Sequence, residues 1–202
     1  MTAEKPRKPR ADAERNRAHV LAVAKATFAK KGSASTLEEI ARAAGVGIGT
    51  LYRHFPTRDD LVVAIYRREI EQLAVAAKEL SVRHPPVEAM RAWMHVFIDY
   101  MVTKTGMSAA LDALAGGTTE LYADTTDALT GAMNDLAAHA VATGEVTIDV
   151  EPIDLLRAVS SVLKESTSKD ALSAAHRLVD VLVAGLHAAP KPRPTRARRA
   201  KK

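Results

Sequence analysis

Residues 37–65, LEEIARAAGVGIGTLYRHFPTRDDLVVAI, decide the fold of this chain. Thr36 and Glu39 form the pattern of a capping box, in which a hydroxyl and a carboxylate bond to the free amides of a helix's first turn. Gly45 can adopt the left-handed backbone that ends this helix in a sharp turn. A second helix is expected from about Gly47 to Phe55. Two short helices joined by such a turn predict a helix-turn-helix, the layout of a motif that places a helix in the major groove of DNA.

Helices are also predicted on both sides of this motif. Apolar residues at helical spacing predict a helix from about Asn16 to Lys31. Pro56 interrupts the chain after the motif, and the cap Thr57-x-x-Asp60 opens a long helix that extends to about Leu80. Two consecutive prolines then prevent this helix from continuing, so we expect a domain boundary near residues 81–86.

The run from Thr36 to Leu61, TLEEIARAAGVGIGTLYRHFPTRDDL, closely resembles the DNA-binding signature of the TetR family of transcriptional regulators. One departure is Gly47, where the family usually has a serine or a similar capping residue. The resemblance implies that the second helix of the motif lies in the major groove and that the flanking backbone is contacted by Thr36, Thr50, Tyr52, His54 and Arg58. Base contacts are expected from the start of that helix, chiefly Gly47, Ile48 and Gly49, and from Arg53.

The chemistry of these side chains agrees with the resemblance. Hydroxyl, imidazole and guanidinium groups are common donors to phosphate oxygens. Ile48 can offer a base only an apolar contact, for instance to a thymine methyl group, whereas Arg53 can pair with guanine through two hydrogen bonds. The alternative for Tyr52 is a half-buried aromatic residue whose hydroxyl meets only water.

Composition and charge restrict the other functions. The 202 residues contain no cysteine, which excludes disulfide scaffolds, thiolate metal sites and cysteine nucleophiles. The formal net charge of +5 is divided unevenly: +3 over residues 1–10, +2 over 11–60, −7 over 61–190 and +7 over 191–202. No apolar run is long enough to span a bilayer, and the N-terminus lacks a signal peptide. We therefore expect a soluble, cytoplasmic protein, associated with the nucleoid and without a membrane partner.

The predicted fold class is all-α, with about nine helices. We expect a flexible basic arm at residues 1–15, the helix-turn-helix domain at 16–62, a helical effector-binding and dimerisation domain at 63–189 and a disordered basic tail at 190–202. The arm either contacts DNA or only keeps the chain soluble. The tail has the same two interpretations.

The helix expected from Val87 to Lys104 gathers methionines and aromatic residues on one side. Such a stripe builds a core, but the same residue types line adaptable ligand cavities. A short helix at Met107–Ala115 and a long one from Thr118 or Thr119 to Gly144 are expected to complete the cavity. The predicted pocket residues are Met90, Trp93, Met94, Phe97, Tyr100, Met101, Met107, Leu111, Tyr122 and Met133.

After an extended connector at residues 146–150, two helices are expected at Pro152–Ser166 and Lys169–His187. The last is apolar on two adjoining stripes, so it needs one partner in its own domain and one outside it. The TetR resemblance implies a dimer formed by the last two helices, and a charged residue at Leu182 should abolish it. The predicted interface residues are Leu156, Val159, Leu163, Leu172, Ala175, Val179, Leu182 and Leu186; Leu178, Val181 and Gly185 form the second stripe.

Together these patterns predict a ligand-responsive transcriptional repressor. It is expected to bind a palindromic double-stranded DNA operator as a homodimer and to be released by a small, fairly apolar effector. No cofactor, metal or catalytic site is expected, because the chain lacks a nucleophile elbow, a phosphate loop and a zinc-binding helix. His95 and Asp99 form an i, i+4 pair that is a ligand contact, a metal site or a surface hydrogen bond. A helical adaptor without DNA-binding function is the other alternative, against which the helix-turn-helix argues.

Overall fold

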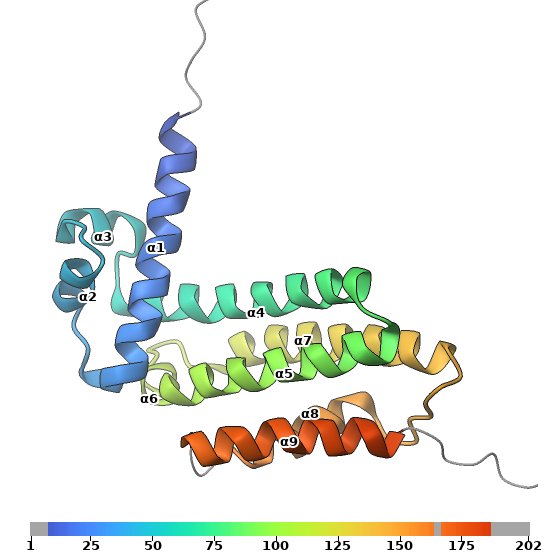
Figure 1. The fold of residues 1–202 in the computed structure, drawn as a ribbon. Helices are drawn as coiled ribbons and strands as arrows, with labels where there is room; N and C mark the ends of the chain where they lie inside the picture. The colour runs from blue at the N-terminus through green and yellow to red at the C-terminus, as the bar shows by residue number, and fades with distance from the viewer. Residues whose placement is uncertain (1–7, 164–166, 187–202) are drawn as a thin grey trace, which may run out of the picture.

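The computed structural model describes residues 8–163 and 167–186, and this part of the chain is all-α, as predicted (Figure 1). The predicted basic tail at residues 190–202 and the first seven residues of the predicted arm lie outside the described ranges. In chain order the described elements are α1 (Lys8–Lys31), the 3-10 turn η1 (Gly32–Ala34), α2 (Leu37–Ala43), α3 (Ile48–His54), α4 (Arg58–Arg83), α5 (Pro86–Gly106), α6 (Ser108–Asp112), α7 (Thr119–Ala142), α8 (Pro152–Ser161) and α9 (Lys169–Leu186).

Helix α1 is longer than the sequence pattern predicted. It begins at Lys8, whereas a flexible arm was expected up to residue 15 and a helix from about Asn16. Pro9 does not prevent this helix, because it lies in the first turn, where its missing N–H would have no partner in any case. A proline near a helix N-terminus therefore does not argue against helix.

The first three helices form a small module around an apolar core. Phe28 of α1, Leu51 of α3 and Phe55 after α3 are each at most 1% exposed, and Ile40 of α2 is fully buried. The short helices α2 and α3 bury only one face each, so they depend on α1 for their stability. In Figure 1, α2 and α3 lie beside the middle of α1.

The remaining helices form a layered body (Figure 1). Helix α4 packs on α5 and α7, while α8 and α9 pack on the opposite side of α5. Trp93 of α5 is fully buried, and its indole N–H donates a hydrogen bond to the carbonyl of Leu73 in α4 at 2.9 Å. Among the described residues, every helix is too short or too polar to span a bilayer.

Helix α1 and η1 attach the module to the body, and the start of α4 is itself bonded to the α6–α7 loop. The Lys25 ammonium of α1 lies 2.5 Å from the Glu69 carboxylate of α4, and that carboxylate is largely buried. The Asp59 carboxylate, in the first turn of α4, accepts a hydrogen bond at 3.0 Å from the amide of Ala115 in the α6–α7 loop. Helix α6 also contacts η1. Because α4 begins directly after α3 and runs the length of the body, a displacement of α4 moves the module.

Candidate nucleic-acid interface

The start of α2 has the capping geometry that the sequence predicts. The Thr36 hydroxyl accepts a hydrogen bond from the Glu39 amide at 3.2 Å, and the Glu39 carboxylate accepts one from the Thr36 amide at 3.4 Å. Lys31, at 2.8 Å, lowers the pKa of Glu39, with a smaller effect from the Thr36 amide. The capping box therefore also ties the end of α1 to the start of α2.

Gly45 ends α2 in the left-handed conformation, with φ of 65°. Its amide donates to the Arg42 carbonyl at 3.1 Å, and the Val46 amide donates to the Ala41 carbonyl at 3.0 Å. This pair of bonds is a Schellman motif, which satisfies the last carbonyls of the helix. It turns the chain so that only four residues lie between the end of α2 and the start of α3.

Replacing Gly45 with alanine is expected to lower the free energy of unfolding by about 1–2 kcal/mol, because a Cβ is strained at this φ. Gly49→Ala is the matched control: Gly49 lies within α3, nothing is within 4 Å of an added Cβ, and alanine favours helix there by up to about 1 kcal/mol. Urea unfolding of both variants measures the difference. Equal effects would show that the turn does not require the left-handed conformation.

Helix α3 presents an unusual surface to solvent. Leu51 faces the core, while Ile48 and Tyr52 on the other side are 38% and 43% exposed. The remaining predicted DNA-contacting positions of this segment divide into two groups: Gly47, Gly49 and Arg53 are exposed, and Thr50 and His54 are half-buried. Large apolar side chains displayed on a short helix between polar neighbours indicate a binding surface.

The start of α3 has no side-chain cap. Gly47 is the N-cap residue, and it lacks the hydroxyl that would bond to the free amides of the first turn. These amides point out of the helix and can bond to an anion such as a phosphate. The first turn of α3 therefore presents backbone donors together with the Ile48 side chain.

Two of the predicted phosphate contacts are already engaged within the chain. Thr36 is exposed, but its hydroxyl accepts the capping hydrogen bond of α2. The Arg58 guanidinium, in the first turn of α4, lies 5.1 Å from the centre of the Phe28 ring. A role for Arg58 in positioning α4 on α1 is therefore as consistent with its surroundings as a phosphate contact.

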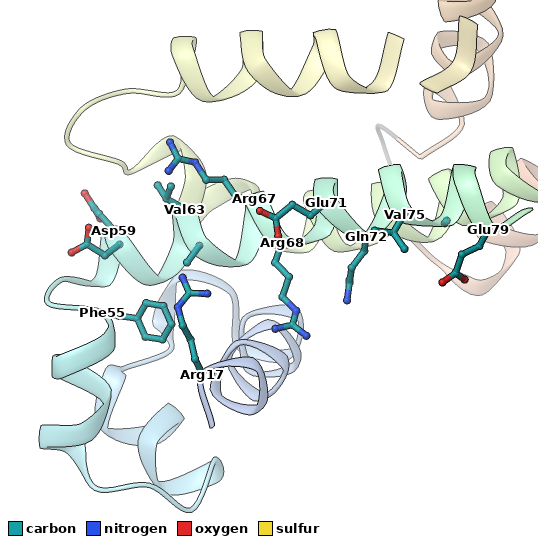
Figure 2. Close-up of a pocket in the computed structure, with 13 residues that line it drawn as sticks. Arg17, Phe55, Asp59, Val63, Arg67, Arg68, Glu71, Gln72, Val75 and Glu79 are labelled. Atoms are coloured by element: carbon teal, nitrogen blue, oxygen red, sulfur yellow. The ribbon is translucent and has the colours of Figure 1, made fainter. Parts of the chain in front are cut away.

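An open groove of about 830 Å³ lies in the corner between α1 and α4 (Figure 2). Arg17 of α1, which the sequence analysis did not single out, places its guanidinium 5.2 Å from the centre of the Phe55 ring. Along α4 the groove is lined by Arg67 and Arg68 and by the carboxylates of Asp59, Glu71 and Glu79. Because both signs of charge line this groove, it is not the uniformly positive surface that binds phosphates.

The predicted ligand-pocket residues are spread along α5, from Met90 to Met107, and continue on α6 and α7, where they belong to the hydrophobic core. Two of them, Met101 and Tyr122, are half-buried, and the other eight are at most 4% exposed. Four surface cavities of the described part of the chain are lined by other residues. Tyr66 of α4 also belongs to this cluster, with its ring centre 6.3 Å from that of Tyr100. The sequence analysis missed it because it occupies an ordinary core position of an apolar stripe.

The structure places most of the predicted dimer residues inside one protomer. Leu156, Val159, Leu163, Ala175 and Val179 are at most 2% exposed, whereas Leu172, Leu182 and Leu186 are half-buried. The second stripe of α9 is the one that faces solvent: Val181 is 66% exposed and Gly185 is also exposed. Five of the eight residues predicted for the interface therefore belong to the core of the protomer, and the other three stay a prediction.

A polar network explains the rotation of α9. His176 and Asp180 border the buried stripe, and both have partners on α5. The His95 Nδ1 lies 2.8 Å from the His176 Nδ1, and the His95 Nε2 lies 3.1 Å from the Asp180 carboxylate. Arg91 also donates to Asp180 at 3.2 Å. His95 thus bonds across the helix interface rather than to Asp99, its predicted partner on α5, which lies 3.5 Å from the His176 Nε2.

Comparisons with known proteins agree with this architecture. The sequence profile described as bacterial regulatory proteins, tetR family, matches residues 20–65, and the profile described as transcriptional regulator SbtR-like, C-terminal domain, matches residues 85–188. An HTH-type transcriptional regulator of Staphylococcus aureus strain USA300 is 30% identical over 115 residues, 55% of this chain. That alignment spans 60% of the length of the relative.

Solved structures match over nearly their whole length. A TetR transcriptional regulator from Streptomyces coelicolor is 39% identical, with a TM-score of 0.78, and the match covers 86% of this chain and 99% of that one. A TetR transcription regulatory protein from Mycobacterium vanbaalenii is 36% identical, with a TM-score of 0.69 and coverage of 89% and 99%. The chain therefore belongs to the TetR family and is a DNA-binding transcriptional regulator, not an enzyme.

Proposed function

We propose that this protein is a ligand-responsive repressor, which binds a palindromic operator as a homodimer and is released by a small, fairly apolar effector. The observation that carries the DNA-binding part is the outer face of α3. It displays Ile48 and Tyr52 on a helix whose first turn has free amides and whose inner face is fixed by the buried Leu51.

On DNA, α3 lies in the major groove with its first turn toward the bases. Ile48 contacts a thymine methyl group, and Arg53 donates hydrogen bonds to a guanine. The hydroxyls of Thr50 and Tyr52 and the amides at the start of α3 bond to phosphates and fix the position of the helix in the groove. Sequence discrimination then depends on few side chains, so the shape of the DNA contributes as well.

The second copy packs on the exposed stripe of α9. In this stripe Leu178 is half-buried and Val181 is exposed. The small residues Ala171, Ala174 and Gly185 lie beside them and allow two helices to approach closely. A twofold dimer repeats the same surface on both partners. It also presents two α3 helices to half-sites about 34–36 Å apart, the separation of successive major grooves on one side of the duplex.

The effector acts through α4. This helix is bonded to the module through Glu69 and Lys25 and to the α6–α7 loop through Asp59, so a ligand that changes the packing of α4 changes the separation of the two α3 helices. The ligand must bind more tightly to the arrangement of the dimer that does not bind DNA. Linkage then requires that operator DNA weaken ligand binding by the same factor that the ligand weakens operator binding.

Tyr52→Phe tests the DNA-binding assignment. We expect about a 10- to 150-fold loss of affinity, because one hydrogen bond to a charged group such as a phosphate contributes about 1.5–3 kcal/mol. The loss should be similar on the operator and on unrelated DNA, since phosphate contacts carry no sequence information. Electrophoretic mobility shifts on both DNAs measure it.

Ile48→Ala and Arg83→Ala complete this experiment. Ile48→Ala should weaken operator binding more than binding to unrelated DNA, because an apolar contact to a thymine methyl depends on sequence. Arg83→Ala is the control, because it removes one exposed cation at the far end of α4, at a distance from α3. Unchanged affinity in both α3 variants would exclude this face of α3 as the DNA-binding surface.

A further inference from the structure

Two histidine rings face each other where α9 packs on α5 (Figure 1). The centres of the His95 and His176 rings are 5.0 Å apart, and their Nδ1 atoms are 2.8 Å apart. The second nitrogen of each ring faces a carboxylate: the His95 Nε2 lies 3.1 Å from Asp180, and the His176 Nε2 lies 3.5 Å from Asp99. Both histidine side chains are 31% exposed, so solvent reaches the pair.

The two carboxylates determine which ring nitrogens carry protons. A neutral imidazole has one N–H donor and one nitrogen lone pair. A lone pair on Nε2 would face a carboxylate oxygen, so the favoured form of each ring carries its proton on Nε2 and directs it to Asp180 or Asp99. Both Nδ1 atoms then turn lone pairs toward each other, which is unfavourable at 2.8 Å. A cation bound by both atoms, either a proton or a metal ion, removes this conflict.

The charges of the surrounding network favour a divalent cation. Glu88, Asp99 and Asp180 carry three negative charges, and Arg91, which contacts both Glu88 and Asp180, carries one positive charge. With both imidazoles neutral, these four side chains leave a net charge of −2. A proton shared by the histidines neutralises half of this charge, whereas a divalent ion neutralises all of it.

We propose that His95 and His176 bind a divalent transition-metal ion of the Cu²⁺ or Ni²⁺ type through their Nδ1 atoms. Histidine nitrogens about 2.0–2.1 Å from an ion and 2.8 Å from each other subtend an angle of about 85–90° at the ion. This is the angle between neighbouring ligands in the tetragonal sites that Cu²⁺ and Ni²⁺ prefer. Tetrahedral Zn²⁺ needs its ligands about 3.3 Å apart, so it fits less well.

Asp180 and Asp99 are positioning residues in this site. Histidines that bind a metal commonly donate their other N–H to a carboxylate, which fixes the ring and makes the ligating nitrogen more basic. In the part of the chain that the structure describes, no group of three or more histidine, aspartate or glutamate side chains is arranged to hold a metal ion. The two histidines are therefore the protein ligands, and water completes the coordination. An open groove of about 370 Å³, lined by Asp180, Glu88 and Glu145, gives solvent access beside the network.

A bound ion joins α9 to α5 across residues that are 81 positions apart in the sequence. His176 and Val181 are separated by about 140° around α9, from 3.6 residues per turn, so the ion lies away from the surface proposed for the second copy. The site is likewise separate from α3. Metal binding therefore does not depend on the proposed dimer, operator or effector, and failure of one proposal leaves the other standing.

Titration calorimetry on the untagged full-length protein tests the site with Cu²⁺, Ni²⁺, Zn²⁺ and Mg²⁺ salts. We expect one tightly bound Cu²⁺ per chain, Ni²⁺ next, Zn²⁺ about 10-fold or more weaker than Cu²⁺, and no binding of Mg²⁺, which prefers oxygen ligands. His95→Gln and His176→Gln should each weaken Cu²⁺ binding by more than 10-fold. His84→Gln, which removes an exposed histidine at the end of α4, should retain the affinity of the wild type.

Two further measurements separate a metal site from a structural histidine pair. Electron paramagnetic resonance of the wild type with one equivalent of Cu²⁺ should show two nitrogen ligands, a result that does not require any variant to fold. Asp180→Asn should keep this spectrum but weaken binding about 10-fold, the lower end of the range for a lost outer-shell partner.

Several results would overturn the proposal. The first is the absence of a tight Cu²⁺ site in the wild type, which would leave the two histidines sharing only a proton. The second is Cu²⁺ binding that survives both histidine variants or that is lost equally in His84→Gln. The third is a spectrum with one nitrogen ligand or none. Mg²⁺ binding as tight as that of Cu²⁺ would assign the ion to the carboxylates instead.

Discussion

Val181→Glu is expected to produce a folded monomer that binds the full operator about 10²- to 10⁴-fold more weakly than the wild type. The residue is 66% exposed on α9, on the helix face opposite to the buried Ala175 and Val179. A carboxylate there leaves the protomer core intact but brings two like charges together at the twofold axis of the proposed dimer. The affinity falls because the two α3 helices no longer bind as one linked unit.

Sedimentation and mobility-shift experiments on the same samples measure both effects. Val82→Glu is the control, because Val82 is 88% exposed at the far end of α4 and carries the same change in charge. Val181→Glu tests the interface more specifically than a charge at Leu182, because Leu182 is half-buried and packs on the protomer core. A Val181→Glu protein that remains dimeric would place the interface elsewhere.

Trp93→Ala is expected to lower the free energy of unfolding by about 3–5 kcal/mol, the range for removing a large aromatic side chain from a core. Trp93 is fully buried at the junction of α4 and α5, where its ring stacks on Phe97 and its N–H bonds to the Leu73 carbonyl. The substitution leaves a cavity between the helices and removes the hydrogen bond to the Leu73 carbonyl.

Urea unfolding followed by circular dichroism measures this loss. Val82→Ala, on the exposed surface of α4, should change stability by less than about 0.5 kcal/mol. Trp93→Phe retains most of the apolar volume, so its loss of stability should lie between those of Trp93→Ala and Val82→Ala. A loss below about 1 kcal/mol in Trp93→Ala would contradict the tight packing of α4 on α5.

The helix-turn-helix was predictable from sequence because its signals are local. The capping boxes at Thr36 and Thr57 and the left-handed turn at Gly45 each depend on residues within one helical turn, and the structure confirms all three. The start of α1 was placed too late because a proline in a first turn has little effect on a helix.

The orientation of α9 was not predictable, because both of its stripes are apolar. What selects the buried one is a set of contacts with α5, more than 80 residues earlier in the chain: His95 with His176, and Arg91 with Asp180. Similarly, Tyr66 looks like any core residue in the sequence. Whether its hydroxyl has a partner depends on what α5 and α7 place beside it.

The most direct test of the central claim is selection of bound sequences from a random DNA library by the full-length protein. The account predicts enrichment of an inverted repeat whose half-sites are centred about 10–10.5 base pairs, or a multiple of that, apart. It also predicts that Val181→Glu enriches no inverted repeat. Enrichment of a single unrepeated site by the wild type, or no enrichment at all, would contradict it.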